Sequence, residues 1–270
     1  MASWQALADE ATRWADTGLV GALWWRDDDA VDASPALERL LAIQHEQAVP
    51  LALAVVPAQA TAALAARLRG TRDVDVLQHG YAHVNHATAG EGKKMELGLH
   101  RPAMMVLGEL GTGWLALERL FGAQALAVMV PPWNRIAATL VPTLPEIGFT
   151  GLSTFGPRRR PRPVQGLLEI NTHVDLIDWK GARGFVGEEA ALTVLVAALA
   201  RARAASPPDS AEPVGVLSHH LAMDGEAWDF LRSLWQRATI LPGLCVSPAR
   251  ALFTTGTAPT SSLVTGEANG

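Results

Sequence analysis

Cysteine is almost absent from this chain of 270 residues, and so are long apolar runs. The single cysteine, Cys245, has no second thiol to pair with, which excludes an internal disulfide and a fold that depends on one. The longest mostly apolar stretch, residues 190–200, is much shorter than the roughly 18 residues that a membrane-spanning helix needs. We therefore expect no disulfide framework and no membrane partner.

Excess positive charge is also missing. Lysine and arginine together number 22 against 27 aspartate and glutamate residues, so the formal net charge is −5. Nucleic acid is thereby disfavoured as a partner, because phosphate binding needs a basic face. Neither GxGxxG nor GxxxxGK(S/T) occurs, which counts against the nucleotide-binding α/β folds. The N-terminal segment lacks the basic start and unbroken apolar core of a secretory signal, so we expect a cytoplasmic location.

What the chain does contain is an alternation of short apolar runs and helical patterns. Most of the runs are apolar throughout, as expected of strands that are covered on both faces. The expected strands are residues 20–25, 51–56, 74–77, 125–130, 149–154, 167–170, 214–218 and 244–246. The expected helices, the first of them capped by Ser34, are residues 35–48, 58–68, 104–120, 135–144, 188–204 and 225–238.

Repeated alternation of strand and helix predicts parallel strands joined by crossover helices. The fold class is therefore α/β, and a distorted (β/α) barrel of seven to eight strands fits better than a doubly wound sheet. Periodicity alone does not decide between the two. We expect one domain over residues 1–254, followed by a loose tail over residues 255–270 that is rich in Thr, Ser and Gly.

Polar clusters follow four of the expected strands, at residues 26–29, 78–86, 132–135 and 219–220. In a barrel of parallel strands the active site lies at the carboxyl ends of the strands. Because several clusters share this position, we expect their side chains to meet in one functional site.

Three consecutive aspartates, Asp27, Asp28 and Asp29, form the first cluster. Adjacent carboxylates repel one another, so they need a metal ion, a neighbouring arginine such as Arg26, or a raised pKa. A solvated loop, or Asp27 capping a helix, would explain the cluster without any function. The functional alternative assigns one carboxylate to a metal and another to general base catalysis.

Three of the eight histidines fall within eight residues in the second cluster. His79 and His83 are four residues apart, so on one helical turn both imidazoles could share a metal; His83 and His86 offer a second pair. Zinc favours imidazole nitrogen, and a catalytic zinc site keeps one position open for water. The alternative is a polar loop that holds unrelated histidines.

Taken together, these motifs resemble the polysaccharide deacetylases of the NodB-homology type, carbohydrate esterase family 4, over roughly residues 20–250. The motifs are the aspartate pair, His79-x-x-x-His83, the turn 129–135, the segment 175–179, and Leu217-Ser218-His219. The resemblance implies a distorted (β/α) barrel that removes acetyl groups from N-acetylated sugars with a divalent metal.

Three metal ligands and a general base follow from the resemblance. It implies that Asp28 is the base and that Asp29, His79 and His83 bind the metal. A slip of one residue would select Asp27 and Asp28 instead, and the sequence does not settle which register holds. Gly80 stands where the family has a hydroxyl residue, which implies that a hydrogen bond to the site is lost.

The later motifs depart further from the family. The arginine that opens its third motif is missing here, and either Arg135 or Arg26 could replace it as the partner of the base. The backbone N–H of Trp133 is implied as a donor to the oxyanion. In the fourth motif the Asp178-Trp179 pair is implied as a wall of the site.

The fifth motif implies that His219 is the general acid, with His220 standing where the family often has aspartate. Structural histidines, and a helix cap beside a core tryptophan in the fourth motif, are the non-functional alternatives.

The sequence thus predicts a metal-dependent hydrolase, with zinc as the expected ion, that removes an acetyl group from an N-acetylated sugar or a related amide. A small or oligomeric carbohydrate is the expected substrate. The alternatives are a non-catalytic carbohydrate-binding relative and a barrel metallohydrolase that acts on another ester or amide. A basic, proline-stiffened segment at residues 156–163 is either a solvated face or a contact for an anionic substrate. The exact substrate and the oligomeric state stay open.

Overall fold

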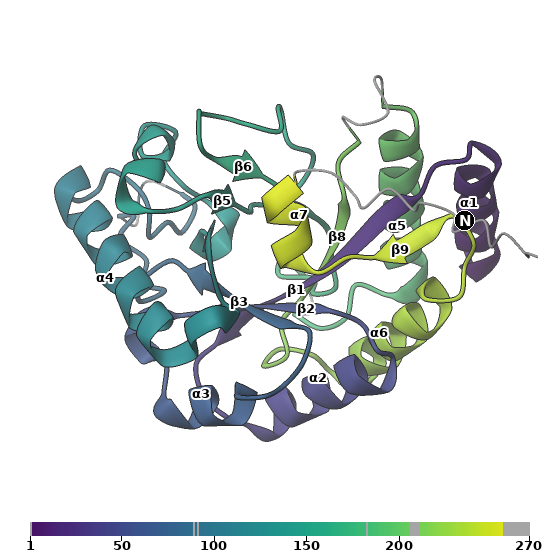
Figure 1. The fold of residues 1–270 in the computed structure, drawn as a ribbon, viewed down its shortest axis with the longest axis horizontal. Coiled ribbons are helices and arrows are strands. Elements are labelled where there is room, and N and C mark those ends of the chain that lie inside the picture. Colours follow the sequence, from purple (N-terminus) through teal and green to yellow (C-terminus); the bar gives the residue numbers. More distant parts are fainter. Residues whose placement is uncertain (1, 89, 91, 182, 206–210, 256–270) are drawn as a thin grey trace, which may run out of the picture.

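The computed structural model describes residues 2–88, 90, 92–181, 183–205 and 211–255, and it shows a curled parallel sheet with helices around its outside (Figure 1). The strands are β1 Gly21–Ala30, β2 Leu51–Val55, β3 Val74–His79, β4 Ala125–Val130, β5 Gly151–Leu152, β6 Leu168–Glu169, β7 Thr172–Asp175, β8 Val214–Ser218 and β9 Leu244–Val246. The α-helices are α1 Trp4–Asp16, α2 Pro35–Glu46, α3 Ala62–Leu68, α4 Ala103–Phe121, α5 Glu188–Arg203, α6 Gly225–Ala238 and α7 Ala249–Thr255.

The sheet runs in the order β6-β5-β4-β3-β2-β1-β8-β7, and β9 pairs with β1. Its two ends approach each other, because only Ile170 and Asn171 separate β6 from β7. Beyond β5, Phe155 forms a parallel bridge with Thr172, the first residue of β7. The sheet therefore curls into a distorted (β/α) barrel, as the sequence predicts.

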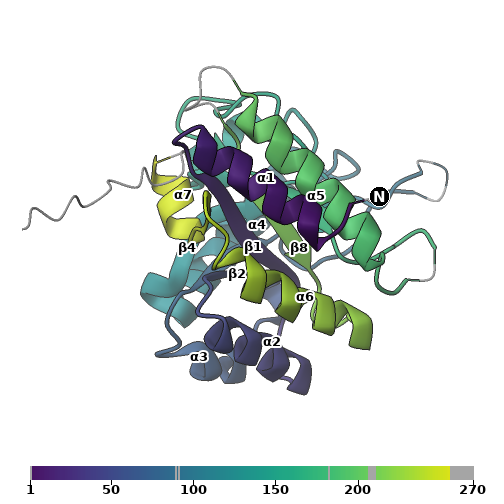
Figure 2. The ribbon, with the colours of Figure 1, turned by 90° about the vertical axis from the view of Figure 1, so that its right-hand side faces the viewer.

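Strand β1 lies in the barrel wall between β2 and β8. Its side chains point alternately to the barrel interior and to the helices outside. Trp24 points inward, where it packs with Ala52 and Ala54 of β2. Trp25 points outward to the helix layer and lies with its ring 5.5 Å from that of Trp235 in α6. The helices α1 and α5 lie side by side over the outside of the sheet (Figure 2).

Several elements differ from the sequence-based expectation; β1, for example, continues through the aspartates to Ala30, and α7 was not expected. Residues 135–144 were expected to form an α-helix, but this stretch and its continuation hold only the short 3₁₀ turns η4 Val141–Thr143 and η5 Pro145–Ile147. Prolines 142 and 145 lack the N–H that a continuous helix would use. Strand β7 was not expected, because its sequence, Thr-His-Val-Asp, is too short and polar to stand out.

Of the helices that the structure describes, none is long and apolar enough to cross a bilayer. The tail expected at residues 255–270 lies, apart from its first residue, outside the described part of the chain.

Candidate metal centre

A β-bulge in β1 places two consecutive aspartates on the same site. The register between β1 and β2 shifts between Asp27 and Ala30, and Asp29 has a left-handed backbone with a φ of 74°. In a regular strand Asp28 and Asp29 would point to opposite faces, but a bulge redirects one of them. Asp28 keeps the inward direction of Trp24 and Arg26, while Asp29 turns toward His79, at the end of β3, and His83 in the loop that follows.

Asp29, His79 and His83 form the one cluster in the described residues whose geometry could hold a metal ion. The Nε2 atoms of His79 and His83 lie 3.1 Å and 3.2 Å from Asp29 Oδ1. Adjacent ligands that share a divalent ion at about 2.0–2.1 Å are roughly 2.8–3.4 Å apart, from octahedral to tetrahedral geometry. Both distances to Asp29 Oδ1 fall in this range, and all three ligand atoms lie within 4.8 Å of one another, which fits a shared ion.

The tautomer of His79 supports the same interpretation. Its Nδ1 lies 3.0 Å from the carbonyl oxygen of Val130, which can only accept a hydrogen bond, so Nδ1 carries the proton. In the neutral ring Nε2 then presents a lone pair toward Asp29 Oδ1. This buried oxygen has no hydrogen-bond partner among the described residues. Two lone pairs facing each other need a cation or a proton between them, and a divalent metal ion would supply the positive charge.

The electrostatics of the cluster favour bound positive charge. Burial works to raise the pKa of Asp29, but its close contact with His79 and the charges of His79, His219 and His83 lower it well below its usual range. Burial works to lower the pKa of His79, but the carboxylates of Asp28 and Asp29 outweigh it, and the pKa is raised. The pKa of His83 is lowered by burial and by the charge of His79. His83 therefore tends to stay neutral, as a metal ligand must be.

Glu96 holds the loop that joins His79 to His83. Its carboxylate is almost fully buried and accepts hydrogen bonds from the backbone N–H groups of Tyr81, Ala82 and Val84, at 3.2, 2.8 and 3.4 Å. His83, inside this loop, has a strained φ of 58°. The Glu96 carboxylate therefore accepts hydrogen bonds from the backbone of the histidine motif. The family was expected to stabilise this motif with the hydroxyl residue that Gly80 replaces.

The glycine in the histidine motif is explained by the same carboxylate. Gly80 has a φ of 56°, and a Cβ atom there would lie 2.1 Å from Glu96 Oε2 and 2.6 Å from the Pro132 ring. A serine or threonine at this position would displace Glu96. Glycine and the buried glutamate thus form one arrangement, which no pattern in the sequence indicated.

Replacing Glu96 tests this arrangement. Glu96→Ala leaves three amides without their acceptor, and we expect metal affinity to fall by about 10–100-fold, the usual cost of losing a group that orients ligands. Glu96→Gln keeps one acceptor oxygen and should recover part of the affinity. Competition with a chelator measures the dissociation constant, with the exposed Glu118→Ala as a control. An unchanged constant in folded Glu96→Ala would refute the role.

Arg26 is the partner of Asp28. Its Nε and Nη2 donate to the two carboxylate oxygens of Asp28 at 2.9 and 3.0 Å, and both side chains are buried. Arg26 also donates to Ser153 Oγ at 2.7 Å and to Asn134 Oδ1 at 2.7 Å. Of the two arginines considered from the sequence, Arg26 is the one that contacts Asp28. The guanidinium of Arg135 instead donates to the carbonyl of Lys94 at 2.9 Å.

The turn that follows β4 presents Trp133 to the histidines. This turn, η3 Pro132–Asn134, holds Trp133 and Asn134 at φ values of 55° and 56°. The N–H groups of Asn134 and Arg135 close the turn, which leaves the N–H of Trp133 without a partner inside it. The indole ring lies 4.5 Å from the ring of His83.

His219, which follows β8, lies beside Asp175 and Trp179. Its Nδ1 is 3.8 Å from Asp175 Oδ1, and the Trp179 ring meets the imidazole edge-on at 4.8 Å. Trp179 Nε1 donates to the second oxygen of Asp175 at 2.9 Å. The pKa of Asp175 is raised by burial, although the charge of His219 works against this.

The aspartate of the fourth motif that reaches the site is therefore Asp175, whose role the sequence did not reveal. Asp178, expected beside Trp179 in the site wall, instead accepts hydrogen bonds from the N–H groups of Lys180 and Gly181 and shapes a turn. Trp179 lies beside His219, in the position expected of it.

Asp27 and His220 form a separate buried pair on the outer face of the sheet. His220 Nδ1 is 2.5 Å from Asp27 Oδ1, and Asp27 also accepts hydrogen bonds from Ser218 Oγ and the His220 N–H. Burial works to lower the pKa of His220, but the charge and hydrogen bond of Asp27 raise it. This arrangement directs Asp27 away from Asp28, so the geometry favours the Asp28/Asp29 register.

No family model matches the chain, and no curated protein matches it. Solved structures do. A protein from Mycobacterium smegmatis named as a polysaccharide deacetylase is 18% identical with a TM-score of 0.61, over 88% of this chain and 90% of that one. A family 4 carbohydrate esterase from Streptomyces lividans, in complex with acetate, is 18% identical with a TM-score of 0.54, over 88% and 96%. A mutant peptidoglycan deacetylase from Bacillus subtilis is 13% identical with a TM-score of 0.54, over 86% and 90%.

The chain therefore has the fold of the family 4 carbohydrate esterases, at low sequence identity. The resemblance drawn from the motifs is confirmed at this level.

Proposed function

We propose that the protein is a metal-dependent hydrolase that removes an acetyl group from an N-acetylated sugar or a related amide. The observation that carries the proposal is the convergence of Asp29 Oδ1 with the Nε2 atoms of His79 and His83. A candidate base, Asp28, adjoins this cluster, and a candidate acid, His219, contributes to the field at Asp29. These are the parts that metal-assisted amide hydrolysis needs.

A divalent ion held by Asp29, His79 and His83 would polarise the acyl group and make a nearby water more acidic. Asp28 takes the proton of the attacking water on a carboxylate oxygen. Its two hydrogen bonds from Arg26 fix the direction of the carboxylate toward the attacking water. Arg26 is in turn held by Ser153 and Asn134.

The developing negative charge needs a donor, and the N–H of Trp133 is the candidate in this chain. His219 then gives a proton to the leaving nitrogen. Because its Nδ1 is turned toward Asp175, Nε2 is the nitrogen that remains to donate. Trp179 packs edge-on against the imidazole and Asp175 lies 3.8 Å from its Nδ1, and we assign both as positioning residues.

The substrate class follows from the aromatic side chains at the rim. Trp179 is 45% exposed although it lies beside His219, and Trp133 is partly exposed beside His83. Exposed indole faces next to a polar site suit the apolar face of a sugar ring. Zinc is the ion that two imidazoles and one carboxylate favour. The cytoplasmic location expected from the N-terminal sequence stays a prediction.

Removing a ligand tests the metal centre directly. We expect purified His79→Ala and His83→Ala to lose stoichiometric zinc while keeping the far-ultraviolet circular dichroism of the wild type, because each supplies one of three ligand atoms. His86→Ala is the matched control and should keep its metal. Elemental analysis reads the result, and unchanged metal in both ligand variants would contradict the assignment. Acetate release from N-acetylglucosamine oligomers by the wild type tests the reaction itself.

A further inference from the structure

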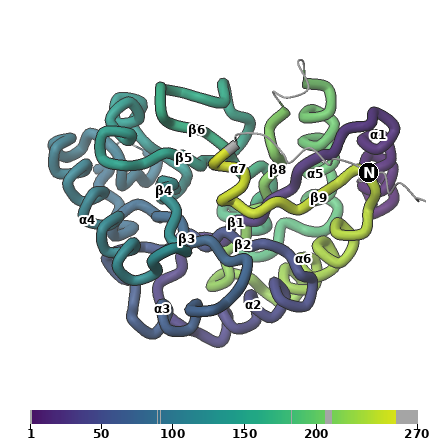
Figure 3. The backbone as a smooth tube through the Cα atoms, viewed as in Figure 1, coloured from purple at the N-terminus to yellow at the C-terminus, as the bar shows by residue number. Residues whose placement is uncertain are grey.

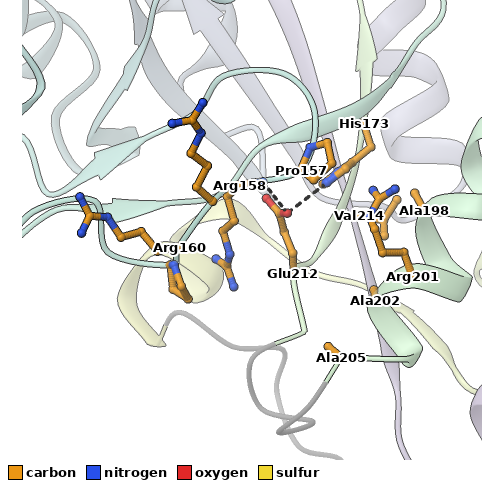
Figure 4. A pocket seen from close by; sticks show the side chains of 12 residues that line it. Pro157, Arg158, Arg160, His173, Ala198, Arg201, Ala202, Ala205, Glu212 and Val214 are labelled. Carbon is orange, nitrogen blue, oxygen red and sulfur yellow. Dashed lines mark hydrogen bonds and ion pairs between the residues drawn. The ribbon is translucent and has the colours of Figure 1, made fainter. Parts of the chain in front are cut away.

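A cavity of about 270 Å³ lies under the proline-stiffened basic segment and away from the metal centre (Figure 4). Its lining residues are Pro157, Arg158, Arg159, Arg160, Pro161, His173, Ala198, Arg201, Ala202, Ala205, Glu212 and Val214. Val214 begins β8, whereas His219 follows the end of that strand. Strand geometry separates the two by roughly 13 Å or more. The cavity is thus distinct from the candidate metal centre.

Arg158 presents a guanidinium whose hydrogen bonds are incomplete. Its Nη1 donates to the carbonyl of Glu169 at 2.8 Å. Its Nη2 is buried and has no hydrogen-bond partner among the described residues. Burial also lowers the pKa of this arginine. A buried charged donor without an acceptor is costly, so the site favours a ligand that brings an anionic oxygen.

The one carboxylate that lines the cavity is already occupied. Glu212 accepts hydrogen bonds from the N–H groups of Arg158 and Asn171, at 2.9 and 3.3 Å, and lies 3.3 Å from His173 Nε2. His173 Nδ1 accepts the N–H of Gly215, so Nε2 carries the proton and points at Glu212. Glu212 therefore links the backbone at Arg158 and Asn171 to His173, and both of its carboxylate oxygens are occupied by these donors.

Arginine residues lie on two sides of Glu212. In Figure 4, Arg158 and Arg201 lie on opposite sides of Glu212, and Ala198 and Ala202 of α5 line the cavity near Arg201. Four of the twelve lining residues are arginines, against one acid. The volume is near the lower end of the range of about 300–1,000 Å³ that is usual for small-molecule sites, which favours a compact ligand.

We propose that this cavity binds the phosphoryl group of a compact phosphorylated metabolite, with Arg158 and Arg201 as its principal contacts. Guanidinium groups pair with phosphate oxygens in a bidentate manner, which a chloride ion cannot reproduce. The alanine and proline side chains leave room for a small organic body beside the phosphoryl group. This site is independent of the proposed hydrolase function, because no residue is shared between them.

Isothermal titration of the full chain with inorganic phosphate, at constant ionic strength, tests the proposal. We expect saturable binding that weakens by about 10–100-fold in Arg158→Gln, the worth of one charge-assisted hydrogen bond. Arg201→Gln should weaken it in the same direction, and this exposed residue can change without affecting folding. Arg162→Gln removes the same charge from the same segment outside the cavity, and it should bind like the wild type.

A variant of the candidate metal centre tests whether phosphate binds in the cavity or at the metal ligands. His83→Ala should bind phosphate with the wild-type affinity, because the cavity does not involve that residue. The proposal is overturned by an absence of binding at millimolar phosphate, by equal weakening in Arg162→Gln, or by loss of binding in His83→Ala. The last result would assign the phosphate to the metal centre instead.

Discussion

Asp28→Asn is expected to lower kcat by about 10²–10⁴-fold, the usual contribution of a positioned general base, while zinc stays bound. Asparagine keeps the shape of the side chain but cannot take a proton from water. The three atoms that face the metal position belong to Asp29, His79 and His83, so they remain in place. Steady-state rates of acetate release and elemental analysis of the same sample measure both effects.

Asp29→Asn is the matched change one residue along, and it should lose zinc as well as turnover. Asp27→Asn should keep both, since Asp27 faces His220. Asp28→Asn also weakens a buried ion pair, so its thermal unfolding midpoint should fall. The fall should be limited, because Arg26 retains Ser153 and Asn134 as acceptors. Loss of zinc in Asp28→Asn but not in Asp29→Asn would show that the register is wrong.

His219→Ala should also lower kcat by about 10²–10⁴-fold with zinc retained, because the leaving nitrogen then departs without its proton. A substrate whose leaving group needs no proton should recover much of the lost rate. Steady-state rates with both substrates, compared with those of the wild type, measure the effect.

His220→Ala is the control, and its main effect should be on stability. The pKa of His220 is raised in the folded protein, so its pairing with Asp27 stabilises the fold fully below the unfolded pKa of about 6.5. That contribution disappears as the pH rises through the folded pKa. The difference in unfolding midpoint from the wild type should therefore be larger at pH 6 than at pH 9. If His220→Ala abolishes proton donation and His219→Ala does not, the acid is misassigned.

The sequence predicted the fold well, because parallel strands covered on both faces leave a strong apolar signal. Strands β4, β8 and β9 begin and end at the predicted residues. Segments without that signal were missed or misassigned. Strand β7 is short and polar, and residues 135–144 have helical periodicity that Pro142 interrupts.

The candidate site was predictable only where residues are close in sequence. His79 and His83 form a recognisable pair, and so do Asp28 and Asp29. The β-bulge decides which two aspartates face the site, and the sequence contains no pattern that predicts it. Asp29 adopts its positive φ where the pairing of β1 with β2 shifts register. Glu96 is a single acid in a loop, and its role depends on three amides that only the fold brings together.

The central position of β1 has a consequence for the order in which the chain can fold. This strand pairs with β2 along one edge, but its other partners, β8 and β9, come some 190 residues or more later in the sequence (Figure 3). Closing such long loops costs entropy before any contact repays it, so non-local parallel pairing is slow. On the ribosome, the aspartate-bearing strand stays incompletely paired until the segment through Val246 has emerged. We expect folding of this protein to depend strongly on protection of β1 during that interval.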